Sequence, residues 1–456
     1  MTFGMYNVDY EQRIYNPERM RKYRLDRAHA ALKKHGLGAM IVYDFDDFRY
    51  LGYCIWHNYM RRRPARYLLL IRGDGYPYCP ATSQDLGEYR LMPWLRDKMV
   101  LKYGVSVQAP LCMDDEWVDG ELAKQAAEMK DLLKKHRVLD EPVGIDMHFG
   151  LRTVDALRKA GIKVVDGNKA MAEARMIKNE DEIECCRTAG AITESAHWEV
   201  CKALRPGVTE WQIAGVAAKA LFDLGAEELE GPSFILSSGP RFGNFGVQTG
   251  TDRVVRPGEM FVIDINGVSF QGYRTCFYRT YCVGDKPTEK QLAIYEDTYN
   301  RQWSMEKNLR PGISSLDYCK AVLEDGDGKW PGNLHWEGKN WGPRWPEPGY
   351  YGAVPSGHQL GLASGDPGPS PSGSIPRERI TDDGKVVVER PAEKPFTIQK
   401  GMVLATEVGV REWDGKKWLY DAAKLENVVV VTDTGFEVLY RFPYKDLITV
   451  GLPGIY

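Results

Sequence analysis

GMVLATEVGV, residues 401–410, is an apolar run that carries an acidic side chain, Glu407, where a buried strand normally carries an apolar one. The same pattern recurs with Asp264 in FVIDIN, residues 261–266, and with Glu426, which precedes the run NVVVV. A carboxylate buried among apolar residues costs free energy unless it is paired or binds a metal ion. These acids therefore predict a catalytic or metal site built on the strands of a sheet.

Composition indicates a globular protein of more than one domain. The 456 residues are 43% hydrophobic and 27% charged, which is typical of a globular chain long enough for two or three domains. No stretch approaches the roughly 18 consecutive apolar residues of a membrane span, and the N-terminus lacks a secretory signal pattern. Nine scattered cysteines argue against a disulfide framework. We expect a cytoplasmic location, with neither nucleic acid nor a membrane as partner at a net charge of -3.

The pattern of the first 170 or so residues differs from that of the remainder. Helical periodicity in MRKYRLDRAHAALKKHG and ELAKQAAEMKDLLKKH alternates with apolar strands such as AMIVYD. Beyond residues 168–179, long helices are interleaved with FVIDIN, KVVVER and NVVVVTD, which fit buried or central strands. We predict a small α/β domain at residues 1–170 and an α+β catalytic domain at residues 171–456.

Residues 326–376 are crowded with tryptophan, glycine and proline. Glycine and proline break regular structure, and long irregular loops in compact domains are usually functional or disordered. The tryptophans, Trp345 among them, argue against full disorder. We interpret the segment as a lid beside the active site or an arm between subunits. A surface loop with no role in chemistry is the alternative.

The candidate ligands occur in a fixed order along the C-terminal half: Asp264, Asn266, Cys276, His358, Glu407 and Glu426. This order resembles the creatinase/methionine aminopeptidase family, the pita-bread fold, whose metal-dependent members usually carry Asp, Asp, His, Glu and Glu. The resemblance runs from about residue 20 to residue 447 and includes RMIKNEDEIE, VVRPGEMFVIDI, GHQLGL and KLENVVVVTDTGFEVL. It implies a creatinase-like N-terminal domain, a pita-bread catalytic domain and a homodimer.

Within that family the chain is most similar to the dimethylsulfoniopropionate lyases. Cys276 lies twelve positions after Asp264, the longer spacing of those lyases, whereas the peptidases have eleven. The segment SSGPRFGNF lacks the histidine that peptidases and creatinase place after Ser-Gly-Pro. MRKYRLDR and RPARYLLL near the N-terminus also resemble that subgroup.

Carried over residue by residue, the resemblance implies two adjacent metal sites. The first would use Cys276, His358, Glu407 and Glu426. The second would use Asp264, Asn266 and Glu426. Cysteine thiolate is a good ligand for zinc or ferrous iron, whereas Asn266 offers only a weak neutral oxygen where the lyases are expected to carry aspartate. One divalent ion, zinc or iron, is therefore expected in preference to a pair.

A metal-free site is the alternative reading of the same residues. Cys276 would then fill space as a small apolar residue, as in creatinase-type members that work without metal. His358 would act as general acid and base in place of ligand. Glu407 and Glu426 would bind a cationic substrate group directly through charge-assisted hydrogen bonds.

Four further residues are candidates outside the ligand set. Asp366 lies near the position of a catalytic acid in the lyases, although Ser364 aligns best with it. Arg63 and Arg66 belong to the cluster RRRPAR and could clamp a substrate carboxylate; a solvated basic face is the alternative. Trp345 is a candidate for substrate binding.

These residues predict an enzyme that acts on a small polar molecule. The expected reaction is cleavage of a carbon-sulfur or carbon-nitrogen bond in a small charged carboxylate by a lyase or hydrolase, with dimethylsulfoniopropionate as the lead substrate. In an elimination, a base removes the proton alpha to the carboxylate while the site stabilises the developing enolate. Three alternatives stay open: a creatinase-like amidine or urea hydrolase, an Xaa-Pro aminopeptidase-like metallopeptidase, and a pseudoenzyme that uses the pocket for binding.

Overall fold

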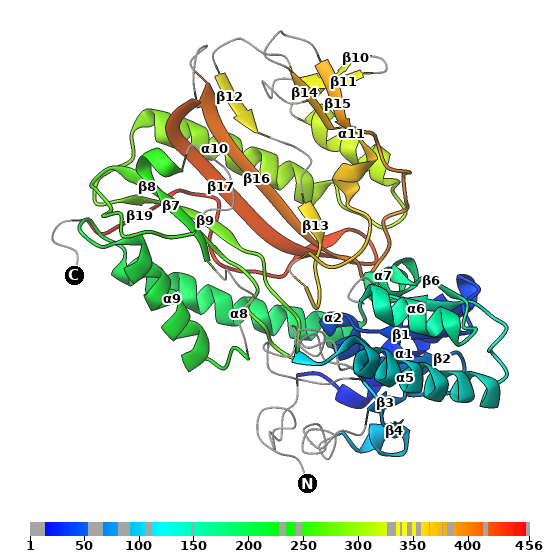
Figure 1. Cartoon of the computed structure of the whole chain (residues 1–456). Coiled ribbons are helices and arrows are strands. Elements are labelled where there is room, and N and C mark those ends of the chain that lie inside the picture. The colour runs from blue at the N-terminus through cyan, green and yellow to red at the C-terminus, as the bar shows by residue number, and fades with distance from the viewer. Residues whose placement is uncertain are drawn as a thin grey trace. The chain divides into compact units, whose positions relative to one another are not determined.

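A computed structural model provides the structure of the chain (Figure 1). It describes residues 14–52, 67–80, 92–104, 112–146, 150–227, 234–242, 249–325, 334–337, 340–343, 349–352, 357–363, 365–375, 377–380, 386–413 and 418–452. Among the helices of these ranges, none is long and apolar enough to cross a membrane.

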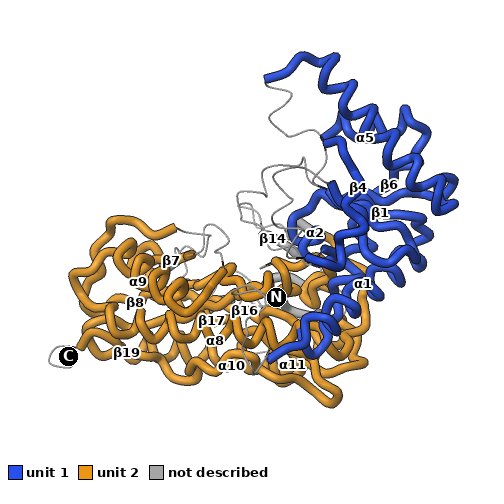
Figure 2. The backbone as a smooth tube through the Cα atoms, turned by 90° about the horizontal axis from the view of Figure 1, so that it is seen from below, with its two compact units in different colours: residues 1–181 blue, residues 182–456 orange. Residues whose placement is uncertain are grey.

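The chain forms two compact units, residues 1–181 and 182–456 (Figure 2). The sequence placed the boundary at residues 170 and 171, earlier than the structure does. The difference arises because α7 (Asn168–Met176) packs with the first unit. The hydroxyl of Tyr50 donates to the carbonyl of Ala174 at 2.8 Å, and Arg175 pairs with Asp47 at 2.7 Å.

The first unit contains a small mixed sheet with helices, as the alternating pattern predicted. Its strands follow the order β2 (Leu68–Ile71), β1 (Ala39–Val42), β5 (Val143–Ile145) and β6 (Val164–Asp166). β1 runs antiparallel to β2 and parallel to β5. The remaining elements are α1 (Pro17–Lys34), α2 (Phe45–Gly52), β3 (Cys79–Pro80), β4 (Met99–Leu101), α5 (Asp115–Lys135) and α6 (Leu151–Lys159), with a 3-10 turn at Pro93–Lys98.

The second unit is built on two sheets. In the first, β8 (Glu259–Ile265) pairs with β7 (Phe234–Ser238) and β9 (Tyr278–Val283), and β9 pairs with β19 (Ile448–Val450). In the second, β17 (Trp418–Val431) lies between β16 (Val403–Trp413) and β18 (Phe436–Val438). β12 (Gly349–Gly352) and β13 (Gly357–Gln359) both pair with β16. The helices are α8 (Glu180–Ala203), α9 (Glu210–Asp223), α10 (Glu289–Lys307) and α11 (Ser315–Asp325).

Of the three runs predicted to be buried or central strands, two form central strands. FVIDIN forms most of β8 and NVVVV ends β17, both with a neighbour on each side. KVVVER instead contributes β15 (Val386–Arg390) to a two-stranded sheet with β14 (Arg377–Ile380). A short valine run alone does not distinguish a central strand from a hairpin strand. The aromatic segment likewise holds a hairpin, β10 (Leu334–Glu337) with β11 (Asn340–Pro343).

Helix α10 packs against β16 and β17 and ties them together through buried polar groups (Figure 1). Glu306 is fully buried and accepts hydrogen bonds from Gln302 and from Asn427, each at 2.7 Å. Gln302 also donates to the hydroxyl of Thr406 at 2.8 Å. Asn427 and Thr406 directly neighbour Glu426 and Glu407, so this network fixes the backbone at both acids.

Arg279 of β9 fixes β17 from the other side. Its guanidinium donates to the carbonyl of Glu426 at 2.6 Å and to the side-chain oxygen of Asn427 at 2.7 Å. It also donates to the carbonyl of Phe442 at 3.2 Å and lies 4.2 Å from the ring centroid of Phe277. Arg279 is only 1% exposed, so water cannot replace these bonds.

We predict that Arg279→Met lowers the free energy of unfolding by about 3 kcal/mol, because buried carbonyl and amide oxygens lose their donor. Urea unfolding followed by circular dichroism measures this change. Arg187→Met is the matched control, since Arg187 pairs with Glu437 near the surface, and its loss should cost less than about 1 kcal/mol. Equal effects of the two substitutions would contradict the assigned role of Arg279.

Candidate metal centre

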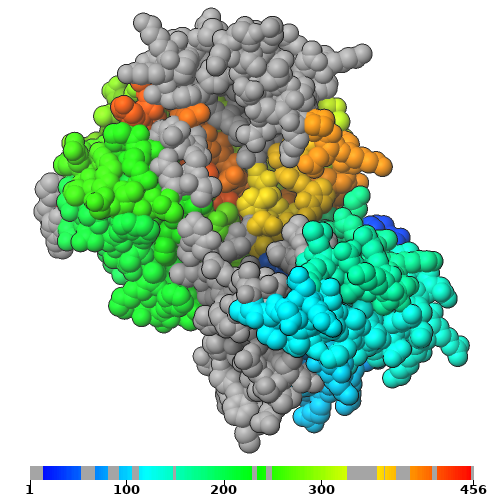
Figure 3. Space-filling model, in the orientation of Figure 1, coloured from blue at the N-terminus to red at the C-terminus, as the bar shows by residue number. Residues whose placement is uncertain are grey.

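Strand pairing brings five of the predicted ligands to one region of the second unit. Glu407 of β16 lies directly opposite Glu426 of β17, and His358 of β13 lies opposite Ala405 of β16. Cys276 comes two residues before β9, in which Tyr278 is the partner of Asp264 in β8. In Figure 3 the gold atoms of the segment around residues 357–375 lie beside the orange atoms of the C-terminal strands.

Cys276, His358 and Glu426 form the tightest group. One ligand atom from each, the thiol sulfur, a ring nitrogen and a carboxylate oxygen, lies within 4.8 Å of the other two. The Nε2 atom of His358 is 3.8 Å from Oε1 of Glu426. This is the one group of three or more such side chains with that spacing among the residues that the structure describes.

The ring of His358 is oriented by its own chain. Its Nδ1 atom lies 2.8 Å from the carbonyl oxygen of Gln359. A carbonyl can only accept, so Nδ1 carries a proton, and Nε2 is the ring nitrogen that faces Glu426. Metal-binding histidines are commonly fixed by this kind of hydrogen bond from the other ring nitrogen. Gly357 precedes the histidine at φ 138°, and a Cβ there would lie 2.1 Å from the carbonyl oxygen of Ala405.

The buried carboxylates have oxygen atoms without hydrogen-bond partners. Both oxygens of Glu426 and Oδ2 of Asp264 contact no donor within the described part of the chain. Both side chains are 0% exposed. Burial, followed by the charges of neighbouring carboxylates, raises the pKa of Glu426 well above its usual value. Burial also raises the pKa of Asp264. A cation bound between these two carboxylates would offset the free-energy cost of burying them.

The thiol of Cys276 is suited to the same cation. Burial, and then the charge of Glu426, raises the pKa of this thiol well above its usual range. A divalent metal ion reverses that preference, because a coordinating thiol loses its proton outright. Sulfur, imidazole nitrogen and carboxylate oxygen together are ligands that zinc and ferrous iron accept. The residues present therefore fit one such ion.

Glu407, also a predicted ligand, faces Lys424, a residue that the sequence analysis did not single out. Its Oε2 lies 3.4 Å from Nζ of Lys424, and it does not belong to the group within 4.8 Å. Lys424 is two residues before Glu426 on β17, and alternate residues of a strand share a face. The two-residue spacing of lysine and glutamate in KLE, residues 424–426, was the sequence signal that a cation would lie beside the acids.

The other predicted residues lie at the margin of this group or outside the described ranges. Asn266 follows β8 and is half-buried. Asp366 is 5% exposed, and its amide donates to the carbonyl of Gln359 at 3.0 Å, but its carboxylate is not part of the group within 4.8 Å. The predicted substrate-binding residues Arg63, Arg66 and Trp345 all lie outside the residues that the structure describes.

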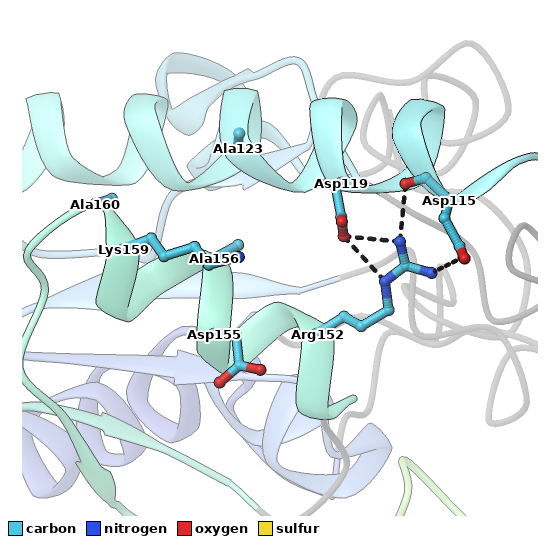
Figure 4. A pocket seen from close by; sticks show the side chains of 8 residues that line it. All are labelled: Asp115, Asp119, Ala123, Arg152, Asp155, Ala156, Lys159 and Ala160. Atoms are coloured by element: carbon cyan, nitrogen blue, oxygen red, sulfur yellow. Dashed lines mark hydrogen bonds and ion pairs between the residues drawn. The ribbon is translucent and has the colours of Figure 1, made fainter.

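A separate hollow of about 600 Å³ lies in the first unit between α5 and α6 (Figure 4). It is lined by Asp115, Asp119, Ala123, Arg152, Asp155, Ala156, Lys159 and Ala160. Arg152 pairs with Asp115 and Asp119, each at 2.7 Å, so its charge is already balanced. None of the predicted site residues contributes to this hollow.

Curated relatives include peptidases and a lyase. The chain is 30% identical over 211 residues to the probable dipeptidase PepE of Mycobacterium bovis, a match that covers 46% of this chain and 54% of that protein. The chain thus spans about half the length of that relative. It is 23% identical over 448 residues to the dimethylsulfoniopropionate lyase DddP of Roseovarius nubinhibens, which covers 94% of this chain and 87% of the lyase.

Solved structures share the fold. The crystal structure of dipeptidase PepE from Mycobacterium ulcerans matches with a TM-score of 0.68 and 21% identity, over 96% of this chain and 100% of that one. The model of Metallopeptidase family M24 matches residues 184–433, more than half of the chain and every candidate ligand. The chain therefore has the pita-bread fold and belongs to Metallopeptidase family M24.

Proposed function

We propose that this protein is a one-metal enzyme that cleaves a carbon-sulfur or carbon-nitrogen bond in a small carboxylate with a cationic group. Dimethylsulfoniopropionate is the lead substrate. The observation that carries the proposal is the division of the site into a compact Cys276, His358 and Glu426 group and a separate Glu407 held by Lys424. The first part fits one metal ion, and the second fits a positioned base.

The relatives support a lyase over most of the chain. The sequence match to DddP covers 94% of this chain, including both units, whereas the sequence match to PepE covers 46% and the match to a PepE structure covers 96%. The sequence identity to DddP is 23%, so the proposed substrate is inferred from the chemistry of the site.

In the proposed elimination, Glu407 takes the proton from the carbon alpha to the substrate carboxylate. The electrons of that C–H bond form the new double bond, the C–S bond breaks, and its electron pair leaves with dimethyl sulfide. Acrylate remains as the second product. A divalent ion held by Cys276, His358 and Glu426 would supply a Lewis acid that stabilises negative charge on the substrate carboxylate. Lys424, 3.4 Å from Glu407, keeps that carboxylate in place.

The charge of the site favours a cationic substrate group. With a divalent ion bound, Asp264, Glu426 and the Cys276 thiolate would carry negative charge beside Glu407, and Lys424 is the cation that interacts with these groups. One divalent ion and Lys424 leave a residual negative charge on the group. A sulfonium or ammonium group is attracted to such a site, because Coulomb interactions are strong where water is excluded.

A peptidase is the second candidate, favoured by the 30% identity to PepE and to the Xaa-Pro aminopeptidase of Escherichia coli. The residue after Ser-Gly-Pro counts against it. Arg241 takes this position and is bound to Glu210, to the hydroxyl of Thr251 at 3.2 Å and to the carbonyl of Thr249 at 2.9 Å. These bonds give Arg241 a structural role, and it has no acid–base role comparable to that of histidine.

We predict about one equivalent of zinc or iron per chain in protein purified without a metal-affinity tag. Elemental mass spectrometry measures it. Cys276→Ala should lose the metal, since substitution even of a residue that only hydrogen-bonds to a ligand costs about 10- to 100-fold in metal affinity. Cys282→Ala is the matched control, because Cys282 is equally buried in β9 but bonds to the carbonyl of Asp285. Full metal content in Cys276→Ala would contradict the proposed ligand.

We predict that the protein releases acrylate from dimethylsulfoniopropionate and leaves Gly-Pro and creatine intact. Chromatographic assay of acrylate, proline and sarcosine separates the three activities. Glu407→Gln should lower kcat by about 10²- to 10⁴-fold, the usual contribution of a general base, with the metal retained. Asp366→Asn is the comparison: a larger loss there than in Glu407→Gln would move the base to Asp366. Proline release as the main activity would establish the peptidase instead.

A further inference from the structure

His358 lies on a strand whose outer edge is covered by a loop of the same chain. Among the described strands, β13 pairs with β16 only. The amide of Leu360 donates to the carbonyl of Val403 in β16 at 3.0 Å, so the carbonyl of Gln359 in the same peptide plane points away from β16. Carbonyls alternate in direction along a strand, and that of Gly357 therefore also points outward. Such outward carbonyls need donors from elsewhere.

Residues 365–375, which we call the strap, supply those donors. The amide of Asp366 donates to the carbonyl of Gln359 at 3.0 Å. The hydroxyl of Ser370 donates to the carbonyl of Gly357 at 2.6 Å. These two bonds close the outer edge of β13 on both sides of its histidine.

The side chain of Gln359 fastens the strap in return. Its Nε2 atom donates to the carbonyl of Pro369 at 3.0 Å. Gly368 lies against the same side chain, since a Cβ at that position would be 3.0 Å from Cγ of Gln359. Gln359 is 1% exposed, so water does not compete for these contacts.

The far half of the strap is fixed to α11. Ser315 and Cys319 lie one turn apart on that helix. The hydroxyl of Ser315 shares a hydrogen bond with that of Ser374, and the thiol of Cys319 donates to the carbonyl of Pro371 at 3.1 Å. Every second residue from 367 to 371 is proline, which fixes φ and limits the conformations of the strap. The strap is therefore held in place by contacts that do not involve β13.

The carbonyl of Gln359 joins the strap to the ring of His358. This oxygen accepts from Nδ1 of His358 at 2.8 Å and from the amide of Asp366 at 3.0 Å. A carbonyl oxygen has two lone pairs, and these two donors occupy both. The side chain of His358 is 32% exposed, so a ring without this support would exchange its partner for water.

We infer that the strap positions the ring of His358 in the site, with Gln359 as the residue that couples the two. Gln359 acts on the ring through its carbonyl and on the strap through its side chain. The inference rests on the proposed one-metal function, in which that ring is a ligand. A ring that is already fixed loses less conformational freedom when an ion binds, and it therefore binds the ion more tightly.

Zinc affinity of chelator-stripped protein, measured by competition with a chromophoric chelator, tests the inference. Gln359→Met keeps the length of the side chain but removes the bond to Pro369, and should weaken zinc binding about 10- to 100-fold. Gln291→Met is the matched control, because Gln291 is 4% exposed and donates to the carbonyl of Gly258 in the same unit. It should lower the Tm and leave zinc affinity unchanged. Wild-type affinity in Gln359→Met would overturn the inference.

A second pair of variants tests the strap separately from Gln359. Ser370→Ala removes the bond to Gly357 and should weaken zinc binding as well. Ser370→Thr keeps the hydroxyl and should retain wild-type affinity. Wild-type affinity in Ser370→Ala, or an equal loss in both variants, would mean that the bond between strap and strand does not position the ring.

The position of the ring also has a readout in metal-free protein. Diethyl pyrocarbonate acylates histidine rings, and peptide mass spectrometry gives the rate at each histidine. The rate at His358 should rise severalfold in Gln359→Met, relative to that at His35, whose side chain is 30% exposed in the first unit. Absence of zinc from wild type would contradict the one-metal function, and the labelling rate would then decide the role of the strap. An unchanged rate at His358 overturns that role.

Discussion

Two buried carboxylates with oxygens that accept no hydrogen bond form the constraint on which the second unit depends. Glu426 and Asp264 are fully buried, and among the described residues both oxygens of Glu426 and Oδ2 of Asp264 have no hydrogen-bond partner, whereas Oδ1 of Asp264 accepts from the amide of Phe277 at 2.9 Å. Such groups are tolerated only with a cation nearby. The surrounding structure is arranged to hold them: Arg279 binds the backbone of Glu426, and Glu306 binds the next residue, Asn427. The buried acids destabilise the fold, and the hydrogen bonds around them stabilise it.

The acids themselves were predictable because burial leaves a pattern in sequence. Asp264, Glu407 and Glu426 stand in apolar runs, and those runs form β8, β16 and β17. His358 was predictable from its order between them. The sequence pattern alone could not predict that these residues lie close together. Their proximity depends on the register that sets Glu407 opposite Glu426 and His358 opposite Ala405. The family resemblance implied that these residues share a site, and periodicity did not.

Other features could not be predicted from the sequence, for physical reasons. A lysine is normally found at the surface, and only the strand pairing that sets Lys424 opposite Gly409 places it among acids. KVVVER has the composition of a central strand, and only its partner β14 makes it half of a hairpin. The boundary at residue 181 depends on where α7 packs. In each case the deciding contact is distant along the chain, where local propensity carries no information.

The origin of the three closest ligands has a consequence for how the protein is made. Cys276 precedes β9, and His358 and Glu426 lie in β13 and β17, so the three are neighbours only after long-range pairing is complete. A nascent chain emerging from the ribosome offers none of these ligands near another, so it has no means of trapping a metal ion prematurely. A metal ion at the proposed site would therefore bind late in maturation, from the supply of ions that meets the finished fold.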